Sequence, residues 1–220
     1  MIIAFIGDEG ALAVVNQSDT SSFSVVPLQP QEIQLLLSAA PFQWWITGGW
    51  ALDLFTGQKS RSHFDTDVAL ARKDQTAAQA YLKSWDFQYA VPATSNPVVF
   101  ESWNAGELLE FKIHGSWARE NRDSPWRFEL LLHEIDQGIW SFRYCREVRH
   151  PLDQIGSRTP GGIPYLRPEI ALLYKAARMR QVDDEDFHRV LPHLASQQRA
   201  QLARDVTRFK PQHPWLDLLA

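Results

Sequence analysis

Residues Thr47 to Leu70 read TGGWALDLFTGQKSRSHFDTDVAL, which joins two adjacent glycines to two aspartates spaced one residue apart. Gly48 and Gly49 open a predicted short helix, and Asp65 and Asp67 lie in a predicted strand, DTDVALA. Alternate residues of a strand point to the same face, so both carboxylates project toward one place. Two carboxylates this close repel each other, and one would stay protonated unless a cation lay between them. The pair therefore predicts a bound cation.

The residue types around the aspartate pair indicate which cation and which substrate would bind. Oxygen ligands without cysteine or histidine select magnesium or manganese, and magnesium commonly binds one or two carboxylates together with substrate phosphates. The glycines agree with a phosphate ligand, because a backbone without Cβ can approach phosphate oxygens and helix N-terminal amides attract anions. Arg61 and His63 alternate with the aspartates in RSHFDTD and add positive charge for a triphosphate or for leaving pyrophosphate.

Composition excludes several classes of protein. The chain has 220 residues, a net charge of -4 and one cysteine, Cys145. This charge argues against broad attraction to nucleic acid or membranes, although a local basic groove stays open. Without an internal disulfide, a reducing compartment is expected, with the cytoplasm as the default. The apolar start is too short for a signal peptide, and no run approaches the roughly 18 apolar residues of a membrane span, so no membrane partner is expected.

Hydrophobic periodicity predicts strands and helices to about residue 160 and mainly helices after it. We expect a strand and loop segment over 1–28, a core over 29–160 and a C-terminal helical region over 161–220. A hairpin is predicted around Gly138. The predicted strands are 42–47, 65–71, 87–91, 97–103, 107–115, 124–134 and 139–145, and the predicted helices are 29–40, 50–55, 73–85, 167–181, 184–195 and 196–209.

The order of these motifs resembles a known superfamily. G-G-W-A-L-D at Gly48 to Asp53, then Gly57, Arg61, His63 and the D-x-D strand, are similar to the nucleotidyltransferase superfamily of DNA polymerase beta. Within it, they resemble the aminoglycoside 2''-adenylyltransferase and lincosamide nucleotidyltransferase group. The later segments SPWRFELLLHE and GIPYLRPEIALLYKAARMRQVDDEDF resemble uncharacterised bacterial relatives of that group, so the likeness covers most of residues 43–195.

The resemblance implies an α+β fold, in which a mixed sheet packs on flanking helices and carries the active site at its edge. It also implies two magnesium ions and transfer of a nucleoside monophosphate from a nucleoside triphosphate to a hydroxyl group. By the family pattern, Gly48 and Gly49 hold the triphosphate, while Asp65 and Asp67 hold both metals.

The family pattern also requires a third carboxylate on a later, adjacent strand, where it binds the second metal or takes the proton of the attacking hydroxyl. Glu129, in the middle of WRFELLL, is the candidate for this catalytic and metal-binding position. Relatives often have Asp there, and Glu places its carboxylate one methylene farther out. Glu107 and Glu110, on the predicted strand 107–115, are held in reserve.

Several charged residues have two readings. Lys175 falls on the polar side of its predicted helix, so it is either a surface lysine or, because LYKA resembles the family's segment, a triphosphate ligand. Arg61 is either a phosphate ligand or half of an ion pair, and His63 either orients an aspartate or contacts the nucleotide. Asp53 is expected to cap the helix or to pair with an arginine. The acidic residues 183–186 are expected to stabilise a helix N-terminus.

Three functions stay open from the sequence. The first is a metal-dependent nucleotidyltransferase that uses ATP or another nucleoside triphosphate to modify a hydroxyl of a small molecule, such as an aminoglycoside or a lincosamide. The second keeps this chemistry with tRNA or protein as acceptor, as in bacterial toxins and phage-defence proteins. The third is a nucleotide-binding protein that has kept the fold without turnover.

Overall fold

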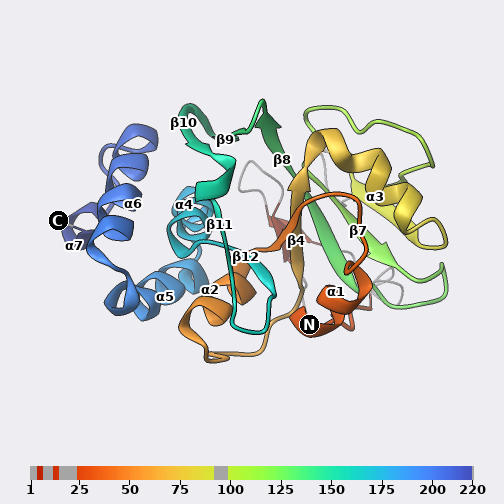
Figure 1. Cartoon of the computed structure of the whole chain (residues 1–220), viewed down its shortest axis with the longest axis horizontal. Helices are drawn as coiled ribbons and strands as arrows, with labels where there is room; N and C mark the ends of the chain where they lie inside the picture. Colours follow the sequence, from red (N-terminus) through yellow and green to blue (C-terminus); the bar gives the residue numbers. More distant parts are fainter. Residues whose placement is uncertain (1–3, 7–11, 15–23, 92–98, 220) are drawn as a thin grey trace. The chain divides into compact units, whose positions relative to one another are not determined.

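The computed structural model describes residues 4–6, 12–14, 24–91 and 99–219 (Figure 1). These residues form two compact units, each built from two separate stretches of the chain. The first unit contains Met1–Gln43 and Phe64–Leu132, and the second contains Trp44–His63 and His133–Ala220. The segment with the two glycines therefore folds with the C-terminal part of the chain, whereas the aspartate pair folds with the first unit.

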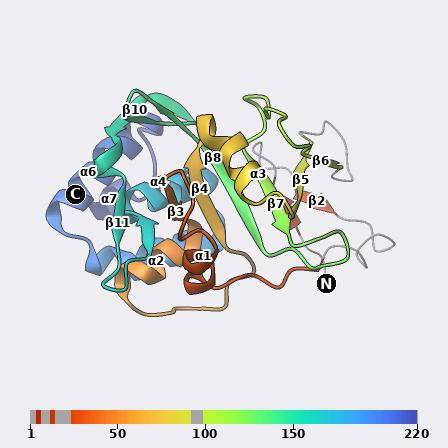
Figure 2. The same cartoon turned by 45° about the vertical axis from the view of Figure 1, so that its right-hand side comes forward.

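The first unit has a sheet with the strand order β4-β8-β7-β5-β6, in which β7 is antiparallel to both β8 and β5. A separate antiparallel hairpin is formed by β1 and β2. Helix α3 lies along one face of the sheet (Figure 2). The elements are β1 (Ala4–Ile6), β2 (Leu12–Val14), α1 (Pro30–Leu36), β4 (Asp67–Ala71), α3 (Gln75–Tyr81), β5 (Asp86–Ala90), β6 (Phe100–Ser102), β7 (Gly115–Arg119) and β8 (Phe128–Asp136), which continues into the second unit.

The second unit combines short strands with the C-terminal helices. Strand β12 is antiparallel to β11 and parallel to β3, while the end of β8 pairs with β9 and β9 with β10, both antiparallel. Helices α4 to α7 form one group, drawn in blue in Figure 1. The elements are β3 (Trp44–Ile46), α2 (Gly48–Thr56), β9 (Ile139–Phe142), β10 (Cys145–Pro151), β11 (Gly156–Arg158), β12 (Pro164–Leu166), α4 (Pro168–Arg178), α5 (Gln181–Val190), α6 (Ser196–Phe209) and α7 (Leu216–Leu219).

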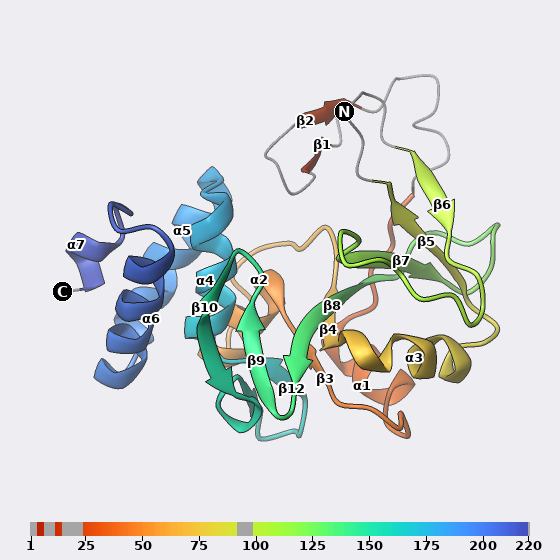
Figure 3. The ribbon, with the colours of Figure 1, turned by 90° about the horizontal axis from the view of Figure 1, so that it is seen from above.

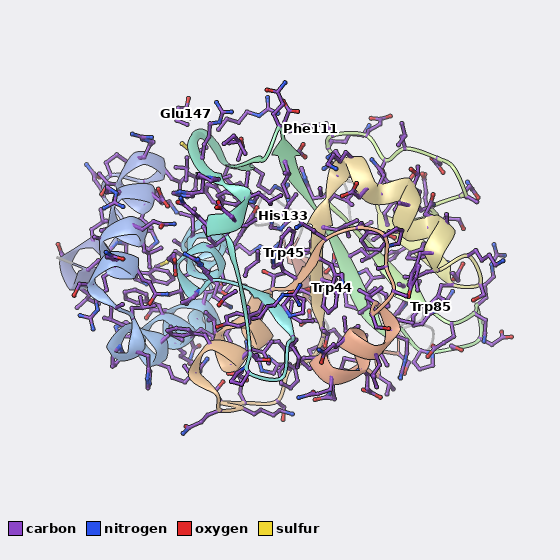
Figure 4. All side chains as sticks on the ribbon, in the orientation of Figure 1. Trp44, Trp45, Trp85, Phe111, His133 and Glu147 are labelled. Atoms are coloured by element: carbon purple, nitrogen blue, oxygen red, sulfur yellow. The ribbon has the colours of Figure 1, made fainter. Side chains whose placement is uncertain are left out.

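Buried aromatic residues hold the second unit together. Trp44 and Trp45, labelled in Figure 4, lie on β3 and are both buried. The β9–β10 hairpin lies beside α4 (Figure 3), where Phe142 packs on Tyr174 with 5.1 Å between ring centroids. Near the C-terminus, Trp215 stacks on Phe187 with 4.0 Å between ring centroids, which fixes the short helix α7 against α5.

The α+β class with a mixed sheet, flanking helices and a C-terminal helical region is confirmed. The hairpin turn is also where the sequence predicts it, since Gln137 and Gly138 both have positive φ, as a tight two-residue turn requires. The domain boundaries at residues 28 and 160 stay predictions. No helix in the described part of the chain is long and apolar enough to cross a membrane.

The strand predicted over 107–115 is wrong, because the strand begins only at Gly115. The backbone before it is bonded by glutamine side chains of α3 instead of a neighbouring strand. The Leu109 amide donates to Gln75 Oε1 at 2.7 Å, and the Gly106 amide donates to Gln79 Oε1 at 3.1 Å. The apolar pattern of ELLEFKIHG is misleading here, since Leu108 is 67% exposed.

Candidate functional site

Helix α2 begins at the two glycines, and Gly48 needs a conformation that suits glycine. Its φ is +64°, in the left-handed region, directly after the extended residue Thr47. The Thr47 side chain makes no capping hydrogen bond to the first turn. The amides at the start of α2 are therefore not capped by the residue that normally does so, which suits an anion at this end.

Gly49 allows a later segment to lie against the start of the helix. A Cβ on Gly49 would come within 2.6 Å of Arg61 Nη2 and 2.7 Å of His63 Nδ1. Since real Cβ atoms do not approach neighbours this closely, the hydrogen of glycine is what makes room for both side chains. The Arg61 guanidinium consequently lies next to the first turn of α2.

Asp53, inside α2, anchors this returning segment. Its carboxylate is buried and accepts hydrogen bonds from the Ser60 amide at 3.1 Å and from the Ser60 hydroxyl. Nε2 of His63 lies 2.6 Å from Asp53 Oδ2. The partners of Asp53 are thus Ser60 and His63, and not the arginine that the sequence suggested.

His63 is buried between Asp53 and an aromatic ring. Its side chain is 2% exposed, and its ring packs on Trp50 with 4.3 Å between centroids. Burial lowers the pKa of His63 below its usual value, although the hydrogen bond to Asp53 opposes the shift. The imidazole is therefore a structural link between α2 and the segment that leads to Asp65, and a nucleotide contact stays a prediction.

A group of paired charges, which we call the charge cluster, joins this segment to α4 and α5. Asp183 and Asp186 have fully buried side chains. Lys175 Nζ lies 3.0 Å from Asp183 Oδ1 and 2.8 Å from Asp186 Oδ2. The cluster consists of Arg61, Lys175, Arg180, Asp183, Asp186 and Arg189.

Each buried aspartate also has arginine partners of its own. Arg61 donates from Nη2 to Asp186 Oδ2 at 3.1 Å, and from Nε to Oδ1 at 3.4 Å. Arg189 also bonds Asp186, whereas Arg180 bonds Asp183 from Nε at 2.8 Å. Burial alone would raise the pKa of Asp186, but the bonds from Arg61 and the charge of Lys175 outweigh it, so this pKa lies below its usual range.

The exposed position expected for Lys175 is wrong, because the residue is only 5% exposed. A pattern read from α4 alone could not show that α5 places two carboxylates over this part of the helix. The ammonium is bonded to both of them, so its contact with a triphosphate stays a prediction. The acidic run does begin a helix, but the carboxylates of Asp183 and Asp186 bind side-chain cations as well.

The predicted catalytic carboxylates belong to the first unit. Asp65 lies just before β4 and Asp67 begins it, and both are partly exposed while Thr66 between them is buried. Glu129, on β8, donates its backbone N–H to the Thr66 carbonyl at 3.0 Å. Glu129 therefore lies on the strand that neighbours β4, and its role as the third carboxylate stays a prediction.

The Glu129 carboxylate occupies the space over a glycine. A Cβ on Gly115 of β7 would come within 2.8 Å of Glu129 Oε1. In residues 24–91 and 99–219, no group of three or more His, Cys, Asp or Glu side chains is close enough to hold a metal ion. The metal site at Asp65, Asp67 and Glu129 therefore stays a prediction.

The reserve candidates do not lie on a strand. Glu107 accepts a hydrogen bond from the Asn104 amide at 3.0 Å, and Glu110 pairs with Lys112 at 2.9 Å, both at the surface. Cys145 begins β10, and burial raises the pKa of its thiol, which disfavours the reactive thiolate. The sequence did not predict that Asp53 binds His63 or that Asp186 binds Arg61, because these partners meet only in the folded chain.

Comparison with known proteins supports the resemblance. Residues 31–129 match the family model of aminoglycoside-2''-adenylyltransferase, and this range includes both glycines and all three carboxylates. A solution structure of the antibiotic-resistance factor ANT(2'')-Ia has a TM-score of 0.54 at 11% identity, covering 84% of this chain and 91% of that one. The search of curated proteins found no match.

Two further solved structures were compared. ANT(2'')-Ia in complex with adenylyl-2''-tobramycin has a TM-score of 0.53 at 13% identity, covering 81% of this chain and 95% of that one. The lincomycin-bound lincosamide antibiotic adenylyltransferase LnuA has a TM-score of 0.46 at 15% identity, covering 76% and 97%. The predicted resemblance to nucleotidyltransferases is confirmed by the family model together with the ANT(2'')-Ia fold, and these matches support an enzyme of that kind.

Proposed function

We propose that this protein transfers a nucleoside monophosphate, AMP from ATP, to a hydroxyl group of a small molecule with the help of Mg²⁺. The observation that carries the proposal is the pair of glycines at the start of α2, with the Arg61 guanidinium held next to Gly49. The family match over residues 31–129 supports the same chemistry.

The start of α2 would bind the triphosphate. The first-turn amides of the helix present a partial positive charge, and Gly48 and Gly49 allow the backbone to approach phosphate oxygens. Arg61 adds a guanidinium at the same end, where it would stabilise the negative charge of the triphosphate and of the leaving pyrophosphate.

Asp65, Asp67 and Glu129 would hold the metal ions. All three provide the hard oxygen donors that Mg²⁺ prefers, and Gly115 leaves the room that the longer Glu129 side chain occupies. When bound, Mg²⁺ would stabilise the charge on the attacking and leaving oxygens of the phosphoryl group. Glu129 would also be placed to accept the proton of the attacking hydroxyl.

The proposed acceptor is an antibiotic of the aminoglycoside or lincosamide class. The tobramycin complex belongs to ANT(2'')-Ia, whose fold this chain shares at low identity. For this protein, the class of acceptor follows from that likeness and from the family match, which together favour a small molecule over tRNA or protein.

The experiment that tests the proposal combines binding with transfer. ATP and GTP are titrated by calorimetry with and without Mg²⁺, and pyrophosphate release is then measured with tobramycin, lincomycin and tRNA as acceptors. We expect Mg²⁺-dependent ATP binding and release that needs an antibiotic. The Asp65→Asn and Asp67→Asn double variant should lower release at least about 100-fold, because it removes metal ligands worth several kcal/mol.

The matched control is Asp217→Asn, which changes an exposed aspartate on α7. It should bind and transfer as the unchanged protein does. Absence of ATP binding in the unchanged protein would exclude the proposed activity, and release that needs tRNA would replace the acceptor.

A further inference from the structure

We infer that Asp186, on α5, is a positioning residue for nucleotide binding: it fixes the Arg61 guanidinium in the orientation that meets a triphosphate at the start of α2. The inference rests on the proposed function, since it assigns how the phosphate site is held in place. The C-terminal helices would then take part in substrate binding by orienting Arg61. The sequence suggests a different route, a direct contact between Lys175 and the triphosphate.

Arg61 is the member of the charge cluster that reaches the start of α2. Its Nη2 lies 2.6 Å from the position of a Gly49 Cβ, and its side chain is 31% exposed. The guanidinium has five N–H donors. The contacts to Asp186 use one on Nε and one on Nη2, and the Ser62 carbonyl accepts one from Nη1 at 3.3 Å. These three bonds leave one N–H on each terminal nitrogen for a phosphate.

A long arginine side chain needs an anchor to hold this orientation. Asp186 contacts Arg61 through both of its carboxylate oxygens, so the planar guanidinium is fixed in direction as well as in position. Asp186 is itself fixed, because Lys175 and Arg189 bind the same buried carboxylate. The anchor is therefore a rigid one, built from α4 and α5.

Neutralisation by Asp186 does not remove the positive charge that a triphosphate needs. The charge cluster contains four cationic side chains, Arg61, Lys175, Arg180 and Arg189, against two carboxylates. Four positive and two negative charges leave a net charge of +2 on the cluster. Asp186 can thus orient Arg61 without giving the surroundings of Arg61 a net negative charge.

Asp183 provides a control inside the same cluster. It is as buried as Asp186, lies one turn away on α5 and binds Lys175 at 3.0 Å. Its arginine partner is Arg180, and its side-chain bonds within the cluster go to Lys175 and Arg180. If both aspartates only stabilised the fold, their variants would have the same effect on ATP affinity. If Asp186 positions Arg61, only the Asp186 variant weakens ATP binding.

The test measures the affinity for ATP with Mg²⁺ by calorimetry, and stability by thermal unfolding, in five proteins: unchanged, Arg61→Gln, Asp186→Asn, Asp183→Asn and the double variant Arg61→Gln with Asp186→Asn. We expect Arg61→Gln and Asp186→Asn each to weaken ATP binding about tenfold, as loss of an oriented charged hydrogen bond predicts. The double variant should be no weaker than Arg61→Gln alone, because Asp186 acts through Arg61.

Asp183→Asn should lower the unfolding temperature but bind ATP as the unchanged protein does. If Asp186→Asn fails to fold, Asp186→Glu takes its place, since it keeps the charge while moving the carboxylate by one methylene; it should weaken ATP binding in the same direction. Arg61→Lys keeps a positive charge without the planar fork and should bind ATP as weakly as Arg61→Gln.

Equal loss of affinity in Asp183→Asn and Asp186→Asn, or full ATP affinity in folded Asp186 variants, would overturn the inference. If Arg61→Gln still binds ATP more weakly than the unchanged protein in either case, the proposed function stands and only the role of Asp186 is excluded. If the unchanged protein binds no ATP, the proposed function and the inference fail together.

Discussion

His63 and Asp53 are ten residues apart in sequence and meet with 2.6 Å between Nε2 and Oδ2, both with almost completely buried side chains. This contact closes the segment after α2 into a loop that returns to the helix. The loop carries Arg61 to Gly49 and ends two residues before Asp65. Asp53, the aspartate in G-G-W-A-L-D, therefore holds this loop against α2.

Replacing Asp53 by alanine should destabilise the protein by about 1–3 kcal/mol, because it leaves the buried His63 Nε2 without its partner and removes two bonds from Ser60. Urea unfolding followed by tryptophan fluorescence measures the change. Ser62→Ala, at an exposed position of the same loop, is the control and should change stability by less than about 0.5 kcal/mol. Equal stability of the two variants would contradict the role of Asp53.

Gly49→Ala should weaken ATP binding as well as the fold. The new Cβ would meet Arg61 Nη2 at 2.6 Å and the buried His63 ring at 2.7 Å, and Asp53 and Trp50 hold that ring in place. Arg61 would therefore have to leave its position next to α2. Calorimetry with ATP and Mg²⁺ should show an affinity at least several-fold lower.

Gly57→Ala is the matched control for Gly49→Ala. Gly57 has a φ of +73° with nothing near its Cβ position, so alanine there costs about 1–2 kcal/mol of backbone strain alone. It should lower stability and leave ATP affinity unchanged. Loss of affinity in both variants would mean that the helix as a whole, and not the space at Gly49, controls binding.

Lys175→Met should destabilise the protein by about 3 kcal/mol, because it removes the cation shared by two fully buried carboxylates. The arginines that remain on Asp183 and Asp186 keep the expected cost at the lower end of the range for breaking a buried pair. Thermal and urea unfolding measure it. Lys83→Met, at an exposed position, is the control and should be nearly neutral. A neutral effect of Lys175→Met would show that the ammonium is dispensable for the fold.

Stability should fall as the pH drops below about 6.5, the ordinary pKa of histidine, in part because of His213. Its Nε2 must donate to the Ala176 carbonyl at 3.1 Å, and its Nδ1 must accept from the Trp215 amide at 3.2 Å, so the folded protein requires the neutral ring. Burial accordingly lowers the pKa of His213. As the pH falls, the unfolded chain therefore binds the proton at a higher pH than the folded protein does, and each decrease in pH favours unfolding.

His213→Gln keeps a donor near Ala176 but cannot be protonated. It should be less stable than the unchanged protein at pH 7.5 and should lose less stability between pH 7.5 and 5.5. Urea unfolding at several pH values gives both slopes. His63, whose pKa is also lowered, is unchanged in the variant and leaves part of the slope in place. Parallel slopes for the two proteins would exclude His213 as a source of the pH dependence.

Short-range patterns predicted the elements around the site well. The helix after the glycines and the strand that follows Asp65 lie where the sequence places them, because glycine conformation and apolar runs act locally. The burial of Lys175 and the anchoring of Arg61 could not be predicted in this way. Asp186 is 125 residues from Arg61, and neither the helical period around Asp186 nor the loop sequence around Arg61 shows that they meet.

The strand predicted over 107–115 is wrong for a related reason. Its alternating apolar residues fit a strand, but a strand also needs a neighbour with free backbone groups. The side chains of Gln75 and Gln79 satisfy that backbone first. Polar residues of one helix thus decide the conformation of a segment about thirty residues later, and a local pattern does not contain this information.

The division of the second unit between Trp44–His63 and His133–Ala220 has a consequence for how the protein is made on the ribosome. The helix that begins with the two glycines is synthesised early but completes its unit only when α4 and α5 have left the exit tunnel. A nascent chain that stops at residue 132 already carries every residue of the nucleotidyltransferase signature, yet lacks the buried aspartates that secure Arg61. Synthesis of His133–Ala220 should therefore be the step that commits the early helix to its native place, and chaperone binding should be strongest before that point.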